Sequence, residues 1–181
     1  MHLRQSVRLL AAAGALVLAT PVLASCGFNY ATDRVYTPGS GVNDRDASVD
    51  VLSAVVVSAQ SGSGTFIASF ANNNADESAT VTSIVGSGDD ADLKVTMSGP
   101  IEIAPQGLVN LATDGGVPIT GDLEAGQTVS LTITFGDGSS VDMTPPVVAD
   151  CGDYSGLDTS ATDTPASDTP CEVESPDATE E

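Results

Sequence analysis

The chain has 181 residues, with 25 Asp and Glu against five Lys and Arg, and a net charge of −20. This length accommodates one ordinary domain with tails, and a chain with 41% hydrophobic residues is too apolar to be disordered throughout. The shortage of basic residues argues against nucleic-acid binding, which uses Lys and Arg to neutralise phosphates, and against docking on anionic lipid through a basic patch.

Residues 1–25 have the pattern of a secretory signal peptide, because Arg4 and Arg8 precede an apolar run from Leu9 to Ala19 and no acidic residue is present. The run is about half the ~20 apolar residues that a membrane-spanning helix needs. Leu23-Ala24-Ser25-Cys26 follows and resembles the lipobox of bacterial lipoproteins. Cys26 is therefore the expected lipidation site, which would anchor the mature protein on the extracytoplasmic side of the cell membrane. The alternative is an ordinary cysteine beside a standard cleavage site.

Removal of the signal peptide changes both the charge and the cysteine count. It leaves three basic and 25 acidic residues, a net charge of −22. With Cys26 lipidated, Cys151 and Cys171 remain as an even pair in an oxidising compartment, which favours a disulfide between them over two free thiols. A bridge closing about twenty residues would contribute ~3 kcal/mol if the loop were otherwise ordered.

Composition divides the mature chain into three parts. Residues 26–46 are the expected lipidated N-terminus and linker, and residues 47–149 are the expected folded domain. Residues 150–181 contain ten acidic residues, no Lys or Arg, and repeated Asp-Thr-Pro elements. Such a composition predicts an acidic tail that is disordered outside any Cys151–Cys171 loop.

The folded domain shows strand periodicity and no helical spacing over three turns. Ser61–Gly64 is a turn between two β-rich runs, which is typical of a hairpin. Seven to nine short strands separated by turn residues favour an all-β, two-sheet β-sandwich. The expected strands are Val49–Ser58, Thr65–Ala71, Ala79–Val85, Leu93–Met97, Leu108–Ala112, Val117–Thr120, Thr128–Phe135 and Ser140–Thr144.

Three segments resemble a known family. GGVPITG at 115–121 and LEAGQTVSLTITFGDG at 123–138 are similar to the C-terminal half of the PCu(A)C-type periplasmic copper chaperones. IEIAPQG at 101–107 resembles the segment that leads into the family's Gly-Gly element. The lead-in Tyr36-Thr37-Pro38, together with Gly41-Val42-Asn43, resembles actinobacterial envelope lipoproteins that carry this domain. The resemblance covers about residues 42–148 and implies a cupredoxin-like or immunoglobulin-like sandwich.

The resemblance also implies copper, which the family holds with His and Met ligands. The His and Met expected after the Gly-Gly element fall on Pro118 and Thr120, and the only histidine is His2, in the signal peptide. Met97 and Met143 are weak metal candidates, and their strand patterns favour packing over coordination. Copper is thus implied as the cofactor while its standard ligands are lacking.

Other chemistry has little support in the sequence. Asp89, Asp90 and Asp92 could offer oxygen ligands to Ca²⁺, but they lack EF-hand spacing, so a solvated turn is favoured. Asp137 between two glycines indicates a hairpin turn. The mature chain has no His for acid–base work, no Gly-x-Ser-x-Gly motif and no phosphate loop, so no catalytic residue is expected and the protein is predicted not to be an enzyme.

The leading hypothesis is a membrane-anchored envelope lipoprotein whose copper-chaperone-like domain acts as a divergent accessory or binding module linked to metal homeostasis. The alternative is a structural or protein-interaction domain displayed on the cell surface without metal binding. Either hypothesis expects the membrane as a partner through Cys26 and an envelope protein as a further partner.

Overall fold

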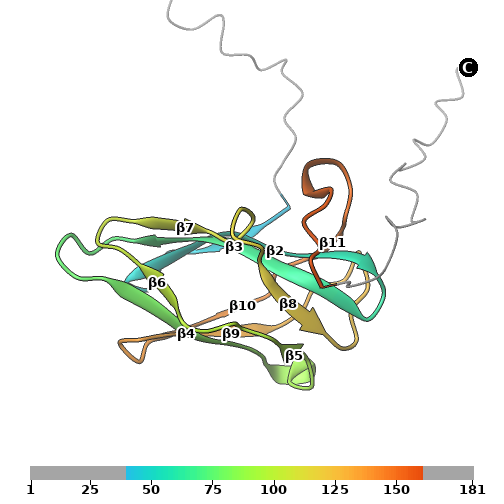
Figure 1. Cartoon of the computed structure of the whole chain (residues 1–181). Coiled ribbons are helices and arrows are strands. Elements are labelled where there is room, and N and C mark those ends of the chain that lie inside the picture. The colour runs from blue at the N-terminus through green and yellow to red at the C-terminus, as the bar shows by residue number, and fades with distance from the viewer. Residues whose placement is uncertain (1–39, 161–181) are drawn as a thin grey trace, which may run out of the picture. The chain divides into compact units, whose positions relative to one another are not determined.

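The computed structural model describes residues 40–160, which form two β-sheets packed face to face (Figure 1). The larger sheet has seven strands in the order β1-β2-β3-β8-β5, with β11 beside β2 and β7 beside β3. The smaller sheet has the order β10-β9-β4-β6. The all-β sandwich predicted from the sequence is therefore confirmed.

The elements are short and follow one another closely. The larger sheet contains β1 (Val42–Asp44), β2 (Val49–Gln60), β3 (Ser63–Asn72), β5 (Lys94–Val95), β7 (Leu108–Asn110), β8 (Val117–Thr120) and β11 (Val147–Ala149). The smaller sheet contains β4 (Ala79–Gly86), β6 (Ile101–Ile103), β9 (Leu131–Phe135) and β10 (Ser140–Met143). Two single-turn 3-10 helices, η1 (Gly88–Asp90) and η2 (Gly152–Tyr154), complete the list.

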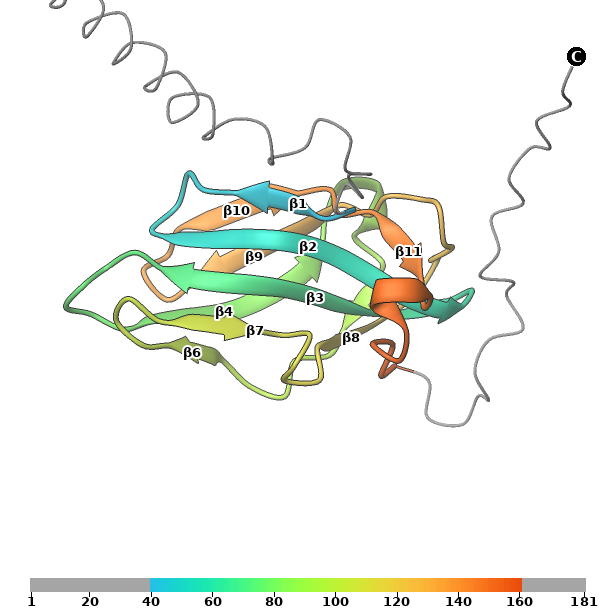
Figure 2. The same cartoon turned by 90° about the horizontal axis from the view of Figure 1, so that it is seen from above.

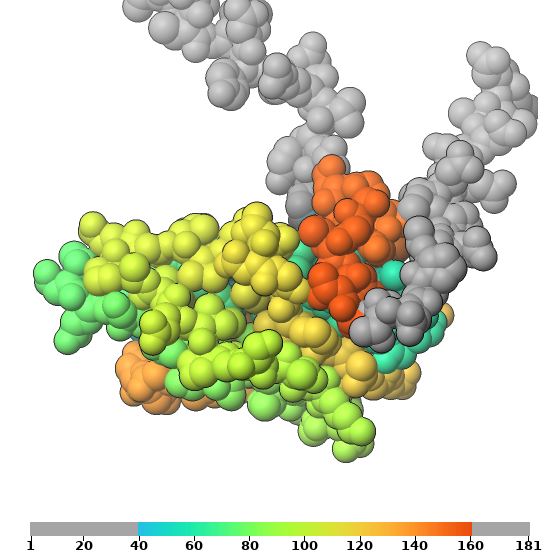
Figure 3. All heavy atoms as spheres, in the orientation of Figure 1, coloured from blue at the N-terminus to red at the C-terminus, as the bar shows by residue number. Residues whose placement is uncertain are grey.

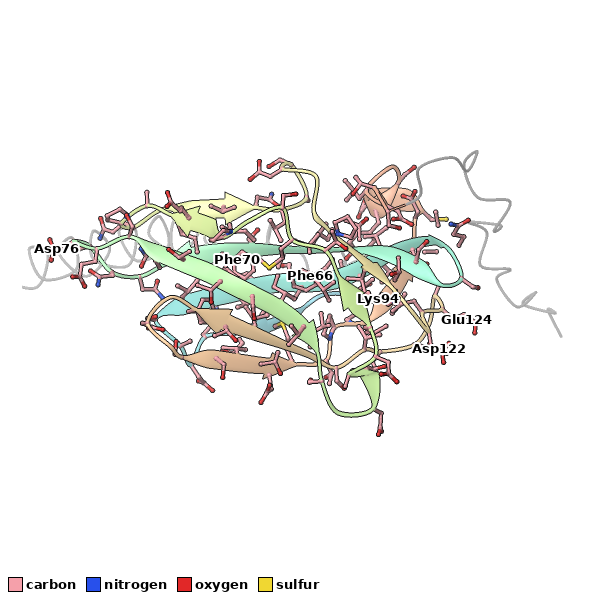
Figure 4. All side chains as sticks on the ribbon, turned by 60° about the horizontal axis from the view of Figure 1, so that its bottom comes forward. Phe66, Phe70, Asp76, Lys94, Asp122 and Glu124 are labelled. Atoms are coloured by element: carbon pink, nitrogen blue, oxygen red, sulfur yellow. The ribbon has the colours of Figure 1, made fainter. Side chains whose placement is uncertain are left out.

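The β2–β3 hairpin forms the centre of the core. Phe66 lies opposite Val56 and Phe70 opposite Val51, and all four side chains are fully buried. Figure 4 shows Phe66 and Phe70 pointing into the space between the sheets. Replacing either ring with Ala would cost about 3–5 kcal/mol, since the transfer free energy is lost and a cavity remains.

The smaller sheet follows the alternation expected of a strand with one buried face. Leu131, Ile133 and Phe135 of β9 are buried, while Thr132 and Thr134 between them are half-exposed. Thr134 pairs with Ser140 of β10 across the turn that the two glycines around Asp137 predicted.

Three strands were not expected from the sequence: β1, β6 and β11. β1 lies in the segment assigned to the linker, where the Asn43 side chain accepts the Ser53 N–H at 2.7 Å. β11 follows two prolines and pairs in parallel with β2, beginning opposite Val56. The Pro146 carbonyl accepts the Val56 N–H at 3.0 Å, so a proline that cannot donate still joins the chain to the larger sheet.

The first part of the acidic C-terminal region packs on the sandwich. Residues 150–160, here called the strap, lie over the outer face of the larger sheet (Figures 1 and 2). Tyr154 and Leu157 pack against the core, and the Asp158 carboxylate accepts hydrogen bonds from the Ala59 N–H and the Thr65 hydroxyl. Ordered structure is thus present on both sides of residues 47–149, because β1 pairs with β2 and the strap is hydrogen-bonded to the β2–β3 hairpin.

The strap explains why residues on the outward face of β2 are buried. In a strand with one buried face, every second residue would be exposed. Val55 and Val57 face outward, opposite Ile67 and Thr65, yet all four are buried. A strand of an antiparallel sheet with a solvated outer face would carry polar residues there. The Val-rich sequence of β2 thus reflects a strand that is covered on both faces.

Several sequence predictions lie outside the described residues. These are the signal peptide 1–25, the lipidation of Cys26, most of the linker, and the tail from 161 to 181. Within residues 40–160, no helix has the length and apolar character needed to cross a membrane.

Candidate functional site

A surface hollow beside Met97 is the main candidate for a binding site. Its volume is about 330 Å³, and its lining combines apolar side chains with the carboxylate of Asp114. The lining residues come from the connection between β5 and β6, from β6 and β7, and from the chain leading into β8: Met97, Ser98, Gly99, Pro100, Ile101, Val109, Leu111, Asp114, Gly116 and Val117. We refer to it as the Met97 hollow.

The pairing of β5 with β8 brings Met97 to this position. Val95 lies opposite Ile119, and the Thr96 N–H donates to the Pro118 carbonyl at 2.9 Å, which carries the chain past β8 toward its start. The Met97 side chain is half-buried and packs against the edge of the core. Met97 therefore packs against the core, as its strand pattern favoured, and it also lines the Met97 hollow.

The Gly115–Gly116 turn forms another part of the rim. Both residues have left-handed φ angles, +91° and +67°, which glycine adopts without steric cost. A Cβ on Gly116 would lie 2.2 Å from the Thr65 Cγ2, so only glycine allows the turn to approach β3 this closely. The Thr159 hydroxyl donates to the Gly115 carbonyl at 2.8 Å, which places the end of the strap next to the hollow. Figure 3 shows the strap, in orange, against the yellow segment before β8.

The other residues singled out from the sequence do not line the Met97 hollow. Met143 lies in β10 of the opposite sheet and is 7% exposed, as expected of a packing residue. Pro118 is half-buried on β8, and Thr120 is exposed opposite Lys94. Figure 4 shows Lys94 at the same end of the sandwich as Asp122.

The acidic turn near η1 has a structural role. The Asp90 carboxylate accepts the Ser130 N–H at 2.7 Å and so joins the connection after β4 to the start of β9. In residues 40–160, no three His, Cys, Asp or Glu side chains gather in a way that could hold a metal ion. The side chains of Asp89, Asp90 and Asp92 therefore do not form such a group.

A second hollow, of about 410 Å³, lies beside the β9–β10 turn and is polar. Asn72, 3% exposed, donates through its side-chain amide to the Glu77 and Ala104 carbonyls, at 2.9 and 3.1 Å, and so ties two loops together. Asp137 at the rim accepts hydrogen bonds from the Ser139 hydroxyl, the Ser139 N–H and the Ser48 hydroxyl. These bonds favour the ionised carboxylate and lower the pKa of Asp137 below its usual value. The polar groups of this hollow are largely used in joining loops.

The cysteines can be followed only in part. Cys151, at the start of the strap, is disulfide-bonded. Cys26 and Cys171 both lie outside the described residues, so the pairing of Cys151 with Cys171 and the lipidation of Cys26 stay predictions.

Comparison with known proteins gives a likeness of fold. No protein-family model matches the chain, and no curated protein matches it. Among solved structures, the copper-bound PCuAC domain from PmoF2 matches with 14% identity and a TM-score of 0.49, over 60% of this chain and 98% of that domain. The apo PCuAC domain from PmoF1 matches with 15% identity and a TM-score of 0.49, over 60% of this chain and 99% of that domain. Both structures are PCuAC domains, the family that the sequence resembles, and the likeness concerns the fold alone.

The side chains around the hollow do not fit a Cu(I) site. Cu(I) prefers thiolate, thioether and imidazole ligands. Residues 40–160 contain no histidine, and the Met97 hollow offers one thioether and one carboxylate, that of Asp114. Met143 cannot supply a second thioether to the hollow from its buried position in β10. Within residues 40–160, the side chains that line the Met97 hollow therefore do not supply the ligands that Cu(I) prefers.

The sequence did not single out Asp114, which lines the hollow, or the exposure of Leu108 on the neighbouring strand β7. Asp114 was passed over because it lies in a Gly-flanked loop, where acidic residues are usually solvated. Leu108 was placed in an apolar strand, yet its side chain is 61% exposed on β7. The exposure of Leu108 could not be found from local periodicity, because the exposure of an edge strand depends on which strands pair beside it.

Proposed function

We propose that this protein is a non-enzymatic binding module, held at the extracytoplasmic side of the cell membrane by lipid on Cys26, which recognises its partner without a tightly bound metal. The observation that carries this proposal is the Met97 hollow, which is lined by aliphatic side chains together with the carboxylate of Asp114. A surface of this kind gains free energy by burying apolar area, at roughly 25 cal/mol per Å². A role in metal homeostasis is suggested by the resemblance of the sequence to PCu(A)C-type copper chaperones.

A Cu(I) titration tests the absence of a tight metal site. The protein is titrated with Cu(I) in the presence of a competing chelator, alongside Met97→Ala and Met143→Ala. We expect no binding that outcompetes the chelator and no difference between Met97→Ala and the unaltered protein. Tight binding that is lost in Met97→Ala and kept in Met143→Ala would instead assign a copper-chaperone role.

A fractionation experiment tests the anchor. Cys26→Ser should move the protein from the membrane fraction to the soluble fraction and abolish labelling by radioactive palmitate. Cys151→Ser is the matched control, because it removes a cysteine outside the lipobox and should leave both properties unchanged. A Cys26→Ser protein that stays in the membrane fraction would contradict the lipid anchor.

The alternative is a structural or interaction domain that uses its acidic tail and not its sandwich. Cross-linking in the native envelope, with the whole chain and with a chain ending at Ser160, separates the two. The shorter chain keeps the strap, so its sandwich face is intact. Loss of all cross-linked partners in the shorter chain would favour the tail.

A further inference from the structure

The edge of the larger sheet at β7 carries backbone groups that no described residue binds. The Gly107 carbonyl accepts the Asn72 N–H at 2.9 Å, so these two residues form a hydrogen-bonded pair of the β3–β7 ladder. Bonded and non-bonded pairs alternate along an antiparallel ladder. The next pair, Ala71 and Leu108, is therefore non-bonded, and the N–H and C=O of Leu108 point away from β3.

The position outside β7 is vacant among the described strands. β3 pairs with β8 along Ser63–Phe66 and with β7 along Ser69–Ala71. β5 lies outside β8, whereas no described strand lies outside β7. Figure 2 shows β7 at the margin of the larger sheet, next to the short strand β6 of the other sheet. The larger sheet thus has a step in its edge at β7.

The Met97 hollow lies at this step. Val109 of β7 faces the inside of the sandwich with Phe70, its partner on β3, and lines the hollow together with Met97. Leu108 faces the opposite side of the sheet and is 61% exposed. Because side chains alternate along a strand, a strand added outside β7 would place every second side chain in the hollow and the others beside Leu108.

The charge of the molecule restricts what can occupy the step. Residues 40–160 carry 17 Asp and Glu against two bases, Arg45 and Lys94, and neither base lines the hollow, whereas Asp114 does. A second copy of this chain would bring the same excess of negative charge. The segment 161–181 has seven acidic residues and no Lys or Arg, so it is opposed in the same way. A cationic segment is favoured by the field of the whole surface.

We propose that β7 is the site at which an extended segment of a partner protein, with alternating apolar and Lys or Arg side chains, is added to the larger sheet. Backbone hydrogen bonds to Leu108 supply the pairing, and the Met97 hollow takes the apolar side chains. The basic side chains lie near Asp114. This proposal rests on the binding role proposed above and assigns the chemistry of its partner.

The test uses the full-length protein in detergent and a short fluorescein-labelled peptide in which Lys and Val alternate. Fluorescence anisotropy should show saturable binding. Leu108→Pro, which removes the outward N–H without touching a bond to β3, should weaken binding by about tenfold or more, since hydrogen bonds and close approach are both lost. Leu108→Ala keeps the N–H and should have a smaller effect. A peptide with Pro at its central Val should not bind.

Two acidic variants keep the test independent of the folding of Leu108→Pro. Asp114→Asn should weaken binding by several-fold, whereas Asp76→Asn removes the same charge from a loop that does not line the hollow and should have little effect. Equal binding by Leu108→Pro and the unaltered protein, with matching unfolding midpoints, would overturn the proposal. So would equal losses in Asp114→Asn and Asp76→Asn, since they would indicate unspecific attraction.

Sedimentation of the protein alone tests the rival occupant. If the protein dimerises and Leu108→Pro abolishes the dimer, the strand added outside β7 comes from a second copy of the chain. That result would overturn the assignment of a cationic partner. Cross-linking in the envelope separates the strand-addition site at β7 from the more general proposal that the protein is a binding module. If partners are still captured by Leu108→Pro, the binding role stands and the strand-addition site fails.

Discussion

The Asp158 carboxylate accepts a hydrogen bond from the Thr65 hydroxyl at 3.0 Å, although 93 residues separate them in sequence. The other oxygen of the carboxylate accepts the Ala59 N–H at 2.8 Å. Thr65 in turn accepts the Thr159 N–H at 2.7 Å, so the strap and β3 hold each other through a reciprocal pair of bonds. One acidic residue of a highly acidic region is thus a structural residue of the sandwich.

Removal of this carboxylate should loosen the strap. Asp158→Ala is expected to lower the free energy of unfolding by about 1–3 kcal/mol, because hydrogen bonds to a charged group are lost and Thr65 stays buried. Asp153→Ala, at an exposed strap position, is the matched control and should change stability little. Urea unfolding measures both. Equal effects of the two substitutions would contradict the role given to Asp158.

Gly116 should tolerate alanine less well than Gly138. Both have positive φ angles, so each Ala variant carries a backbone penalty of about 1–2 kcal/mol. At Gly138 nothing lies within 4 Å of the added Cβ, whereas at Gly116 the Thr65 Cγ2 would be 2.2 Å away. We therefore expect a clearly larger loss for Gly116→Ala in the same unfolding experiment.

A double substitution separates the clash from the backbone penalty. Thr65→Ser removes the Cγ2 and keeps the hydroxyl that bonds Asp158. The loss caused by Gly116→Ala should therefore be smaller in a Thr65→Ser background. Strict additivity of the two substitutions would mean that the Thr65 methyl group does not set the limit at Gly116.

The sequence was sufficient to predict those parts of the fold that depend on local periodicity and turn chemistry. β9 alternates Leu131, Ile133 and Phe135 on its buried face, and the two glycines around Asp137 mark the turn to β10. Such patterns repeat within a few residues, so no knowledge of distant contacts is needed.

Features that depend on distant pairing were not predictable in this way. Asp158 has the local setting of a solvated residue, and its role appears only when Thr65 is placed beside it. Leu108 lies in an apolar run, and its exposure follows from the absence of a described strand outside β7. Of the residues that line the hollow, the sequence singled out Met97, as a weak metal candidate, and did not single out Asp114.

The two methionines of the described region should respond differently to truncation. Met143 is 7% exposed, so Met143→Ala should cost about 2–5 kcal/mol through lost burial and a cavity. Met97 is half-buried at the rim of the hollow, so Met97→Ala should cost less. Peroxide should oxidise Met97 before Met143, because the thioether at the rim is more accessible. Mass spectrometry of the partly oxidised protein measures this order, and faster oxidation of Met143 would contradict the placement of the two side chains.

The pKa of Asp137 should be lower in the folded protein than in an unfolded chain. Hydrogen bonds from the Ser139 hydroxyl, the Ser139 N–H and the Ser48 hydroxyl, in that order, favour the ionised form. A lowered folded pKa stabilises the fold at pH values above the usual value of 3.8, and this contribution is lost as the pH falls through the folded pKa. Ser139→Ala should raise the pKa of Asp137 more than Ser48→Ala, because the hydroxyl of Ser139 makes the largest contribution. Carboxyl NMR titration measures both shifts; a reversed order would show that the bridge from Ser48 to the turn dominates.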